Sequence, residues 1–228
     1  MIDLYSWQTP NGRKVSIMLE ETGIDYNVFP INIGKDEQFQ PHFLEISPNN
    51  RIPAIIDKDN NNYSLFESGA ILMYLAEKSG TLINKSNTDE YYRTIEWLMW
   101  QMGGVGPMFG QVHHFVKYNK GKSAYAEERY SKEARRLYGV MDKRLSKNPY
   151  ISGKEYSIAD ISIWPWTARF DWQEIDLNEF PNVTRWYKEM IDRPAVQKGW
   201  LVPQNLSLIH ISEPTRLRRI SYAVFCVK

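Results

Sequence analysis

The pattern of apolar residues changes near residue 80 of this 228-residue chain, and this change constrains the fold more than any other feature. Before it, short apolar runs typical of strands alternate with segments whose apolar residues recur at helical spacing. From Thr88 onward, almost every segment has the helical period. A mixed sheet and a helix bundle bury their apolar faces differently, so we expect two domains. We predict an α/β domain over 1–80, a linker over 81–87 and an all-helical domain over 88–205.

The first domain is predicted to have the element order βαβ followed by ββα. The predicted elements are a strand at 2–7, a helix at 13–23, a strand at 26–33, a short helix or turn at 40–47, strands at 54–57 and 63–66, and a helix at 67–80. Pro30 removes a backbone donor from the strand at 26–33, which is therefore expected at a sheet edge or a bulge. The Asn- and Asp-rich loop between the last two strands indicates a hairpin.

A long apolar helix is predicted over 89–115, and small residues interrupt it. These residues are Gly103, Gly104, Gly106, Pro107 and Gly110. They interrupt a helix instead of following a strand, so they do not form a dinucleotide-binding fingerprint. We expect them to kink or break the helix.

Further helices are predicted over 123–148, after Ser157, and between Pro181 and Pro194. Asp160 follows Ser157 by three residues, as in a capping box with a shorter acid, and is expected to be structural.

Residues 206–228 differ from the rest of the chain. Their stretches "LSLIHISEPTR" and "ISYAVFCVK" resemble the translated ends of a sequencing-library adapter, and they show no helical period. We therefore expect a non-native tail and exclude it from the fold. The alternative is a short genuine extension.

Excluding this tail changes what the composition implies. The tail holds four of the 28 basic residues and one of the 27 acidic residues, so the formal charge falls from +1 to −2, which leaves no basic surface for nucleic acid. The tail also holds the single cysteine, Cys226, so the rest has no disulfide framework, thiolate metal site or sulfur nucleophile. No signal peptide or membrane-length apolar run is found, and a cytoplasmic location without membrane contact is expected.

The stretch "SPNNRIPAI" at 47–55 places Pro53 directly before a predicted strand. Proline is tolerated at the first position of a strand, and an X-Pro bond is also where a cis peptide occurs. The Ile52–Pro53 bond is therefore a candidate for a specialised backbone feature. A trans proline at a strand start is the more common arrangement.

Four motifs occur in a characteristic order: "TPNG", "SPNNRIPAI", "FESGAILMYLAEKSG" and "YSIADISIWPW". Together they resemble the cytosolic glutathione transferase superfamily, over roughly residues 1 to 200. More narrowly, "TPNG", "EQF", "PNNRIPAI" and "WQMGGVGPMFGQVHHF" are similar to the bacterial nu-class, whose members resemble glutathione-dependent disulfide oxidoreductases. The resemblance implies a thioredoxin-like α/β N-terminal domain, an all-α C-terminal domain and usually a homodimer.

The resemblance also implies how the glutathione backbone is bound. Pro53 is expected to be cis and to turn the backbone of Ile52 into the cleft, where Ile52 pairs with the cysteinyl unit. Glu67 and Ser68 lie at a helix N-terminus, which favours an anion. Ser68 is expected to bind the γ-glutamyl carboxylate and Glu67 the α-ammonium. A plain helix cap is the alternative for both residues.

The "TPNG" motif occupies the place where a thioredoxin-like redox protein carries its cysteines. Thr9, Asn11 and the amides near Gly12 are donors at a helix start, a setting that lowers the pKa of a thiol. Since the predicted domains contain no thiol, the resemblance assigns the reactive thiol to glutathione, held by Thr9 and Asn11. An ordinary turn is the alternative.

Gln38 and Arg129 correspond to further glutathione contacts in the nu-class. The planar guanidinium of Arg129 suits a ligand carboxylate. A surface salt bridge to Glu128 or Glu133 is the alternative for Arg129.

No metal site is expected. His113 and His114 are adjacent, so they point to different helix faces and cannot bind one metal together, and packing or lining of the cleft is expected for them. Most tryptophans are expected in the core or an interface, although an aromatic floor for an apolar co-substrate is possible: Trp97, Trp100, Trp164 and Trp166.

The sequence thus predicts a glutathione-dependent disulfide-bond oxidoreductase that acts through the bound glutathione thiolate, with weaker transferase or peroxidase activity. Its partners would be glutathione and a small disulfide or electrophile. One alternative is a non-catalytic module of the same fold that binds glutathione or a partner. Another is a conventional transferase for apolar electrophiles, which differs in the second-substrate pocket.

Overall fold

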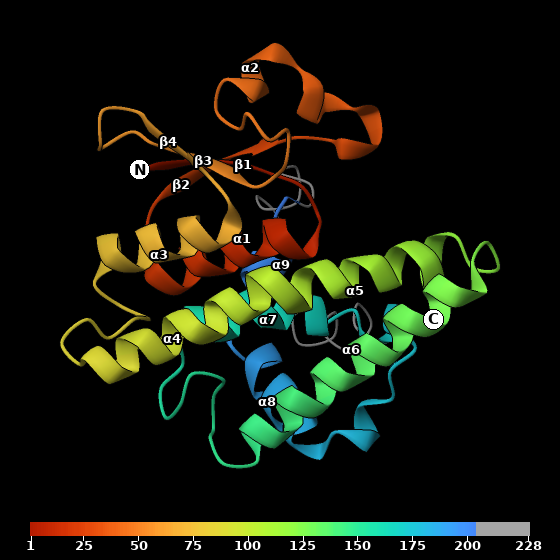
Figure 1. Cartoon of the computed structure of the whole chain (residues 1–228). Helices are drawn as coiled ribbons and strands as arrows, with labels where there is room; N and C mark the ends of the chain where they lie inside the picture. Colours follow the sequence, from red (N-terminus) through yellow and green to blue (C-terminus); the bar gives the residue numbers. More distant parts are fainter. Residues whose placement is uncertain (204–228) are drawn as a thin grey trace, which may run out of the picture.

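The computed structural model describes residues 1–203, which contain a four-stranded sheet (Figure 1). Its strands are β1 (Ile2–Ser6), β2 (Tyr26–Pro30), β3 (Ala54–Asp57) and β4 (Tyr63–Phe66), in the order β2-β1-β3-β4. β1 and β2 are parallel, whereas β1–β3 and β3–β4 are antiparallel. The predicted edge strand and the predicted hairpin are both confirmed. The tail at 206–228 lies outside the described residues.

Helices cover both faces of this sheet. α1 (Pro10–Thr22) and α3 (Ser68–Ser79) pack together on one face, and α2 (Pro41–Leu44) lies on the other with the 3-10 turns η1 (Ile33–Lys35) and η2 (Glu37–Phe39) (Figure 1). α1 ends at Gly23, whose φ of 66° lies in the left-handed region that favours glycine. The larger apolar core lies on the α1 and α3 side and continues into the helical half.

The helical half contains α4 (Thr88–Trp100), α5 (Gly106–Val112), α6 (Ala124–Leu145), α7 (Ile158–Thr167), α8 (Pro181–Ile191), α9 (Pro194–Trp200) and the 3-10 turns η5 (Phe170–Gln173) and η6 (Leu177–Glu179). Every residue of α7 is buried, and the predicted capping box between Ser157 and Asp160 is present. The sequence patterns above do not predict α9. Within residues 1–203, no helix has both the length and the apolarity required to cross a bilayer.

The glycine-rich segment interrupts its helix by widening it. Gln101–Val105 (η3) and His113–Tyr118 (η4) are π-helical turns that continue α4 and α5 as one long rod (Figure 1). The N–H of Gly106 donates to the carbonyl of Gln101, five residues earlier. This wide turn accommodates Pro107 in the first turn of α5, where a missing N–H is tolerated.

The body of α1 is enclosed on all sides. Its residues from Gly12 to Leu19 are buried, and it packs against α3, α7 and α9. A Cβ on Gly199 would lie 2.6 Å from the backbone of Ile17, so only glycine permits this approach of α9. Arg13 is buried as well, with its Nε 3.0 Å from the carbonyl oxygen of Trp200 and its guanidinium 3.6 Å from the centre of that indole ring. The two halves therefore share one interior with α1 at its centre.

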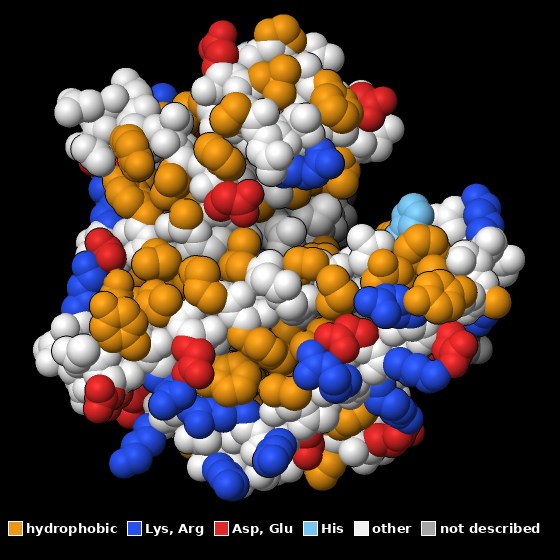
Figure 2. Space-filling model, viewed as in Figure 1, with side chains coloured by type: hydrophobic (Ala, Val, Ile, Leu, Met, Phe, Trp, Pro, Cys, Tyr) orange, Lys and Arg blue, Asp and Glu red, His pale blue; other side chains and the backbone are white. Residues whose placement is uncertain are grey.

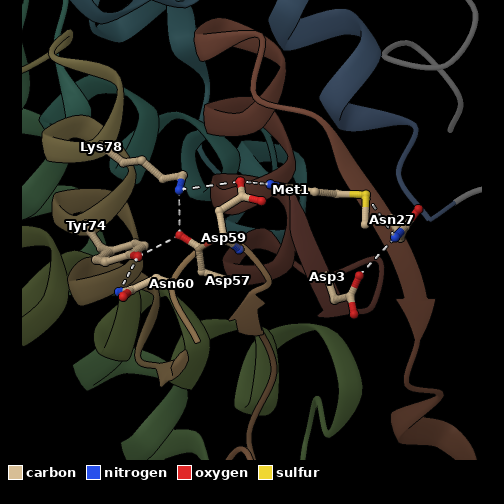
Figure 3. Close-up of polar contacts among 8 residues, drawn as sticks. All are labelled: Met1, Asp3, Asn27, Asp57, Asp59, Asn60, Tyr74 and Lys78. Atoms are coloured by element: carbon tan, nitrogen blue, oxygen red, sulfur yellow. Dashed lines mark hydrogen bonds and ion pairs between the residues drawn. The ribbon is translucent and has the colours of Figure 1, made fainter. Parts of the chain in front are cut away.

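A polar cluster ties α3 to the end of β3 (Figure 3). The buried carboxylate of Asp57 accepts hydrogen bonds from Lys78 Nζ at 2.8 Å and from the Tyr74 hydroxyl at 2.7 Å. Burial by itself raises the pKa of Asp57, but these bonds and one from the backbone of Asp59 hold that pKa below its usual value. Asp57 therefore stays charged at neutral pH and joins the strand to the helix.

We expect Lys78→Met to lower the free energy of unfolding by about 1.5–3 kcal/mol, because it removes a hydrogen bond to a buried carboxylate. Lys85→Met is the matched control, since Lys85 pairs with Glu77 at an exposed site and is expected to matter by less than about 0.5 kcal/mol. Urea unfolding followed by circular dichroism compares the two. Equal losses in both variants would contradict the assigned role of Lys78.

Candidate active site

The strand register brings most of the predicted site residues to one edge of the sheet. Ala54 of β3 pairs with the end of β1 and with Phe66 of β4. The C-terminal ends of β1 and β4 and the N-terminal end of β3 therefore lie at the same end of the sheet. Thr9 follows β1, Pro53 precedes β3 and Glu67 follows β4. Figure 2 shows the surface hollowed between the lobe that carries α2 and the end of α5, and Figure 1 shows the N-termini of α1 and α3 on that side.

The first turn of α1 gathers polar groups. The hydroxyl of Thr9 caps the helix by accepting the N–H of Gly12 at 3.1 Å, and its own proton remains available for donation. Asn11 is half-buried, and its Oδ1 accepts a hydrogen bond from Trp166 Nε1 at 3.0 Å. The simple-turn alternative does not account for this contact with α7. A hydroxyl, an amide and the positive end of a helix thus meet in one place.

Ser68 begins α3 and is buried next to the side chain of Lys14. Lys14 Nζ lies 3.2 Å from Ser68 Oγ, 2.7 Å from Gln101 Oε1 and 3.6 Å from the sulfur of Met102. These contacts connect α1, the N-terminus of α3 and the first π turn of the helical half. A side chain of the second domain therefore helps to hold a predicted glutathione-binding residue.

The surroundings of Lys14 lower its basicity. Burial lowers the pKa of Lys14 to about 7, and the nearby charge of Glu67 opposes that shift. Sequence reasoning missed Lys14, because a lysine is almost never fully buried and the apolar stripe of this helix does not include it. No feature of the sequence by itself shows that Gln101 and Met102 enclose this ammonium group.

Glu67 lies directly before α3 in an unusual backbone conformation. Its φ is 71°, which is uncommon for a residue other than glycine. The side chain is exposed and makes no capping hydrogen bond, so the cap alternative does not describe Glu67. Its carboxylate is accessible to an ammonium group beside the helix N-terminus.

The Ile52–Pro53 peptide bond is cis, and Pro53 is buried. Ile52 packs against the small apolar core beneath α2. Gln38, in η2 of the same lobe, is 9% exposed, and its Oε1 finds no hydrogen-bond partner within residues 1–203. Buried polar groups are normally paired, so this acceptor suits an N–H of a ligand.

Arg129 lies apart from the other predicted site residues. It lines a groove of about 620 Å³ on α5 and α6, together with Met108, Tyr125 and Tyr130. Glu128 pairs with Lys132 and Glu133 with Arg136. The hydrogen bond from Arg136 and, more weakly, the nearby charge of Arg129 lower the pKa of Glu133. The exposed guanidinium thus has no ion pair among the described residues.

His113 and His114 have different surroundings. His113 is buried and stacks on Trp166, with ring centres 5.6 Å apart, whereas His114 is exposed. No cluster of three His, Cys, Asp or Glu side chains suited to a metal occurs in the part of the chain that the structure describes.

These features define a class of protein. A four-stranded mixed sheet, a helical half packed on α1, and polar side chains at the N-termini of α1 and α3 are combined in one chain. Family models of the glutathione S-transferase N-terminal and C-terminal domains match residues 1–77 and 104–194. The chain belongs to the glutathione S-transferase family.

Two Escherichia coli (strain K12) relatives carry the name disulfide-bond oxidoreductase. YfcG is 48% identical over 208 residues, covering 90% of this chain and 96% of the relative. YghU is 41% identical over 215 residues, covering 88% and 74%.

Solved structures of glutathione transferases are similar as well. One from Pseudomonas fluorescens Pf-5, with two glutathione molecules bound, has a TM-score of 0.84 and 46% identity, and the match covers 89% of this chain and 93% of the other. One from Pseudomonas putida, with one glutathione disulfide per subunit, has a TM-score of 0.84 and 43% identity, covering 89% and 91%.

Lys14→Met is expected to alter how stability depends on pH. The pKa of Lys14 is about 7 in the folded chain and ordinary, 10.5, in the unfolded chain. Between these values the unfolded state binds the extra proton, so the native chain gains up to about 1.4 kcal/mol per pH unit relative to the variant as pH rises. Chemical unfolding of both proteins across this range measures the difference. A difference independent of pH would show that Lys14 keeps its ordinary pKa.

Proposed function

We propose that this protein reduces small disulfides with glutathione as the electron donor, and that the thiolate of bound glutathione is the nucleophile. The observation that carries this proposal is the first turn of α1, where Thr9 and Asn11 offer donors at a helix N-terminus and no cysteine lies within residues 1–203. The names of the two bacterial oxidoreductases and the ligands of the similar structures support it.

The remaining predicted residues would hold the rest of glutathione. Ser68 and the N-terminus of α3 would bind the γ-glutamyl carboxylate, and Glu67 its ammonium group. The backbone of Ile52, beside Pro53, would pair with the cysteinyl unit. Gln38 would use its unpaired Oε1 to accept an N–H of the tripeptide.

Arg129 would meet a carboxylate of glutathione from the groove on α5 and α6.

The reaction consumes two glutathione molecules. The first thiolate attacks one sulfur of the substrate disulfide, which forms a glutathione mixed disulfide and releases one substrate thiolate. The second glutathione thiolate attacks the glutathione sulfur of that mixed disulfide, giving oxidised glutathione and the second substrate thiolate. The protons lost by the two glutathione thiols are taken up by the two products through solvent. The protein's part is to ionise and align the thiols.

The alternatives share this fold but differ in what they require. A non-catalytic binding module would not need Asn11 to be held by Trp166 near the thiol, so that contact favours the enzyme. Conjugation of apolar electrophiles and weak peroxidase activity would use the same thiolate and remain secondary activities.

We further propose a homodimer in the cytoplasm, with domains over 1–80 and 88–205 and a foreign tail over 206–228. Hydrophobic side chains gather along α4 and α5 in Figure 2, and α4 exposes 64% of Tyr92 and 47% of Met99. Large exposed apolar patches of this kind mark interfaces.

Asn11→Ala is expected to lower the turnover of a model disulfide about tenfold or more, because it removes one donor to the thiolate in the reactive step. Glutathione affinity should change much less. The assay recycles oxidised glutathione with a coupled reductase, and calorimetry gives the affinity. Cys226→Ser is the control and should retain full activity. Equal losses of turnover and affinity would argue against a role for Asn11 in the reactive step.

Sedimentation velocity should give a species of twice the chain mass at micromolar concentration. Met99→Arg is expected to shift it toward the monomer, because it places a charge in the proposed interface. Lys85→Met serves as a surface control. A monomer for the native chain would overturn the proposed dimer.

A further inference from the structure

The hydrogen bond between Trp166 and Asn11 joins the centre of the helical half to the thiol site. Trp166 lies on α7 and is 8% exposed, and its Nε1 is 3.0 Å from Asn11 Oδ1. The two residues are 155 positions apart in sequence. A contact of this length in sequence forms only when both domains are folded and packed together.

This bond matters because an asparagine side chain has two chemically opposite ends. Its carbonyl oxygen accepts hydrogen bonds, whereas its NH2 group donates two. Only the NH2 end stabilises a thiolate, and the carbonyl end repels it. An indole N–H can only donate, so Trp166 selects the oxygen of Asn11. The NH2 group of Asn11 is then left without a hydrogen bond to any described residue.

Trp166 is itself held in place from two sides. Gln173 Nε2 donates to the carbonyl oxygen of Trp166 at 2.9 Å, and its Oε1 accepts the Tyr138 hydroxyl at 2.6 Å. The ring of His113 stacks on the indole at an interplanar angle of 28° and contacts Gln173 Nε2 at 3.2 Å. The His113 ring thus packs on the indole directly, while Gln173 fixes the main chain of Trp166 and contacts His113.

The His113 ring that stacks on the Trp166 indole is electrically neutral. Burial, with a smaller contribution from Arg169, lowers the pKa of His113 to about 4, so its imidazole carries no charge at neutral pH. The effect of Trp166 on the thiol site is therefore one of orientation and not of added charge.

We propose that Trp166 is a positioning residue that fixes the side chain of Asn11 with its NH2 group free for the glutathione thiolate. This inference rests on the proposed function, because it assumes that Asn11 meets the glutathione thiol. His113 acts one step further away by stacking on the indole, and Gln173 by contacting His113 and the main chain of Trp166. The helical domain thereby controls the orientation of a donor in the other domain.

Trp166→Phe tests the proposal, because it keeps an aromatic ring and removes the N–H. Turnover should fall about fivefold to tenfold, while the Kd for glutathione changes less than about twofold. The pKa of the bound glutathione thiol, measured by ultraviolet titration of its thiolate, should rise. Trp164→Phe is the matched control, since Trp164 is also buried on α7 and its Nε1 donates to the carbonyl of Tyr187.

Two further variants keep the test sharp if Trp166→Phe folds poorly. Asn11→Asp retains an oxygen for Trp166 but has no donor, so the indole N–H resonance should stay near its native position while turnover is lost. In the double variant Asn11→Ala with Trp166→Phe, turnover should equal that of Asn11→Ala alone, because Trp166 acts through Asn11.

The outcomes separate this inference from the proposed function. Unchanged turnover and thiol pKa in Trp166→Phe, or additive losses in the double variant, would overturn the positioning role. Alternatively, the native chain could reduce no disulfide, while the pKa of the bound glutathione thiol still rises in Trp166→Phe and not in Trp164→Phe. That result would support the positioning role of Trp166 and overturn only the proposed oxidoreductase activity.

Discussion

The enclosure of α1 is the constraint on which the rest of the structure depends. Its N-terminal turn carries Thr9 and Asn11, while its body is buried between the sheet, α3, α7 and α9. A helix enclosed in this way cannot shift without disturbing both halves of the chain. The close approach of Gly199 to Ile17 and the burial of Arg13 against Trp200 fix it from the α9 side. The proposed thiol site is therefore built on a helix that is packed against both halves of the chain.

The helical half also positions residues of the proposed glutathione site. Gln101 holds Lys14, which in turn contacts Ser68, and Trp166 holds Asn11. Gly106 leaves room for the Gln101 side chain that contacts Lys14, because a Cβ on Gly106 would lie 2.7 Å from Gln101 Nε2. Two residues assigned to glutathione thus depend on the second domain for their orientation. Separating the domains would expose α1 and also remove the order of the site.

The sequence was sufficient for the fold and for the order of its strands and helices in the first domain, because strands, helix ends and turn residues act locally. Pro30 at an edge strand and the Ser157 capping box are examples of such local signals. It was not sufficient for Lys14, Gln101 or the role of Trp166, whose contacts join residues 54, 87 and 155 positions apart. Interactions at that range depend on how helices pack, which periodicity does not encode. The sequence also did not show that the segment with Gly103 and Gly104 forms a π turn instead of a break.

The groups assembled around the thiol site are mainly neutral, and this suits the proposed chemistry. A cation next to a thiolate would lower its pKa strongly, but nucleophilicity falls as pKa falls, and attack on a disulfide is best from a thiol whose pKa is near the ambient pH. Thr9 and Asn11 supply only dipoles, and His113 is uncharged. Neutral donors at a helix N-terminus stabilise a thiolate moderately and leave it reactive. A site without its own cysteine can in this way activate the thiol of a bound glutathione, provided that the orientation of its donors is fixed.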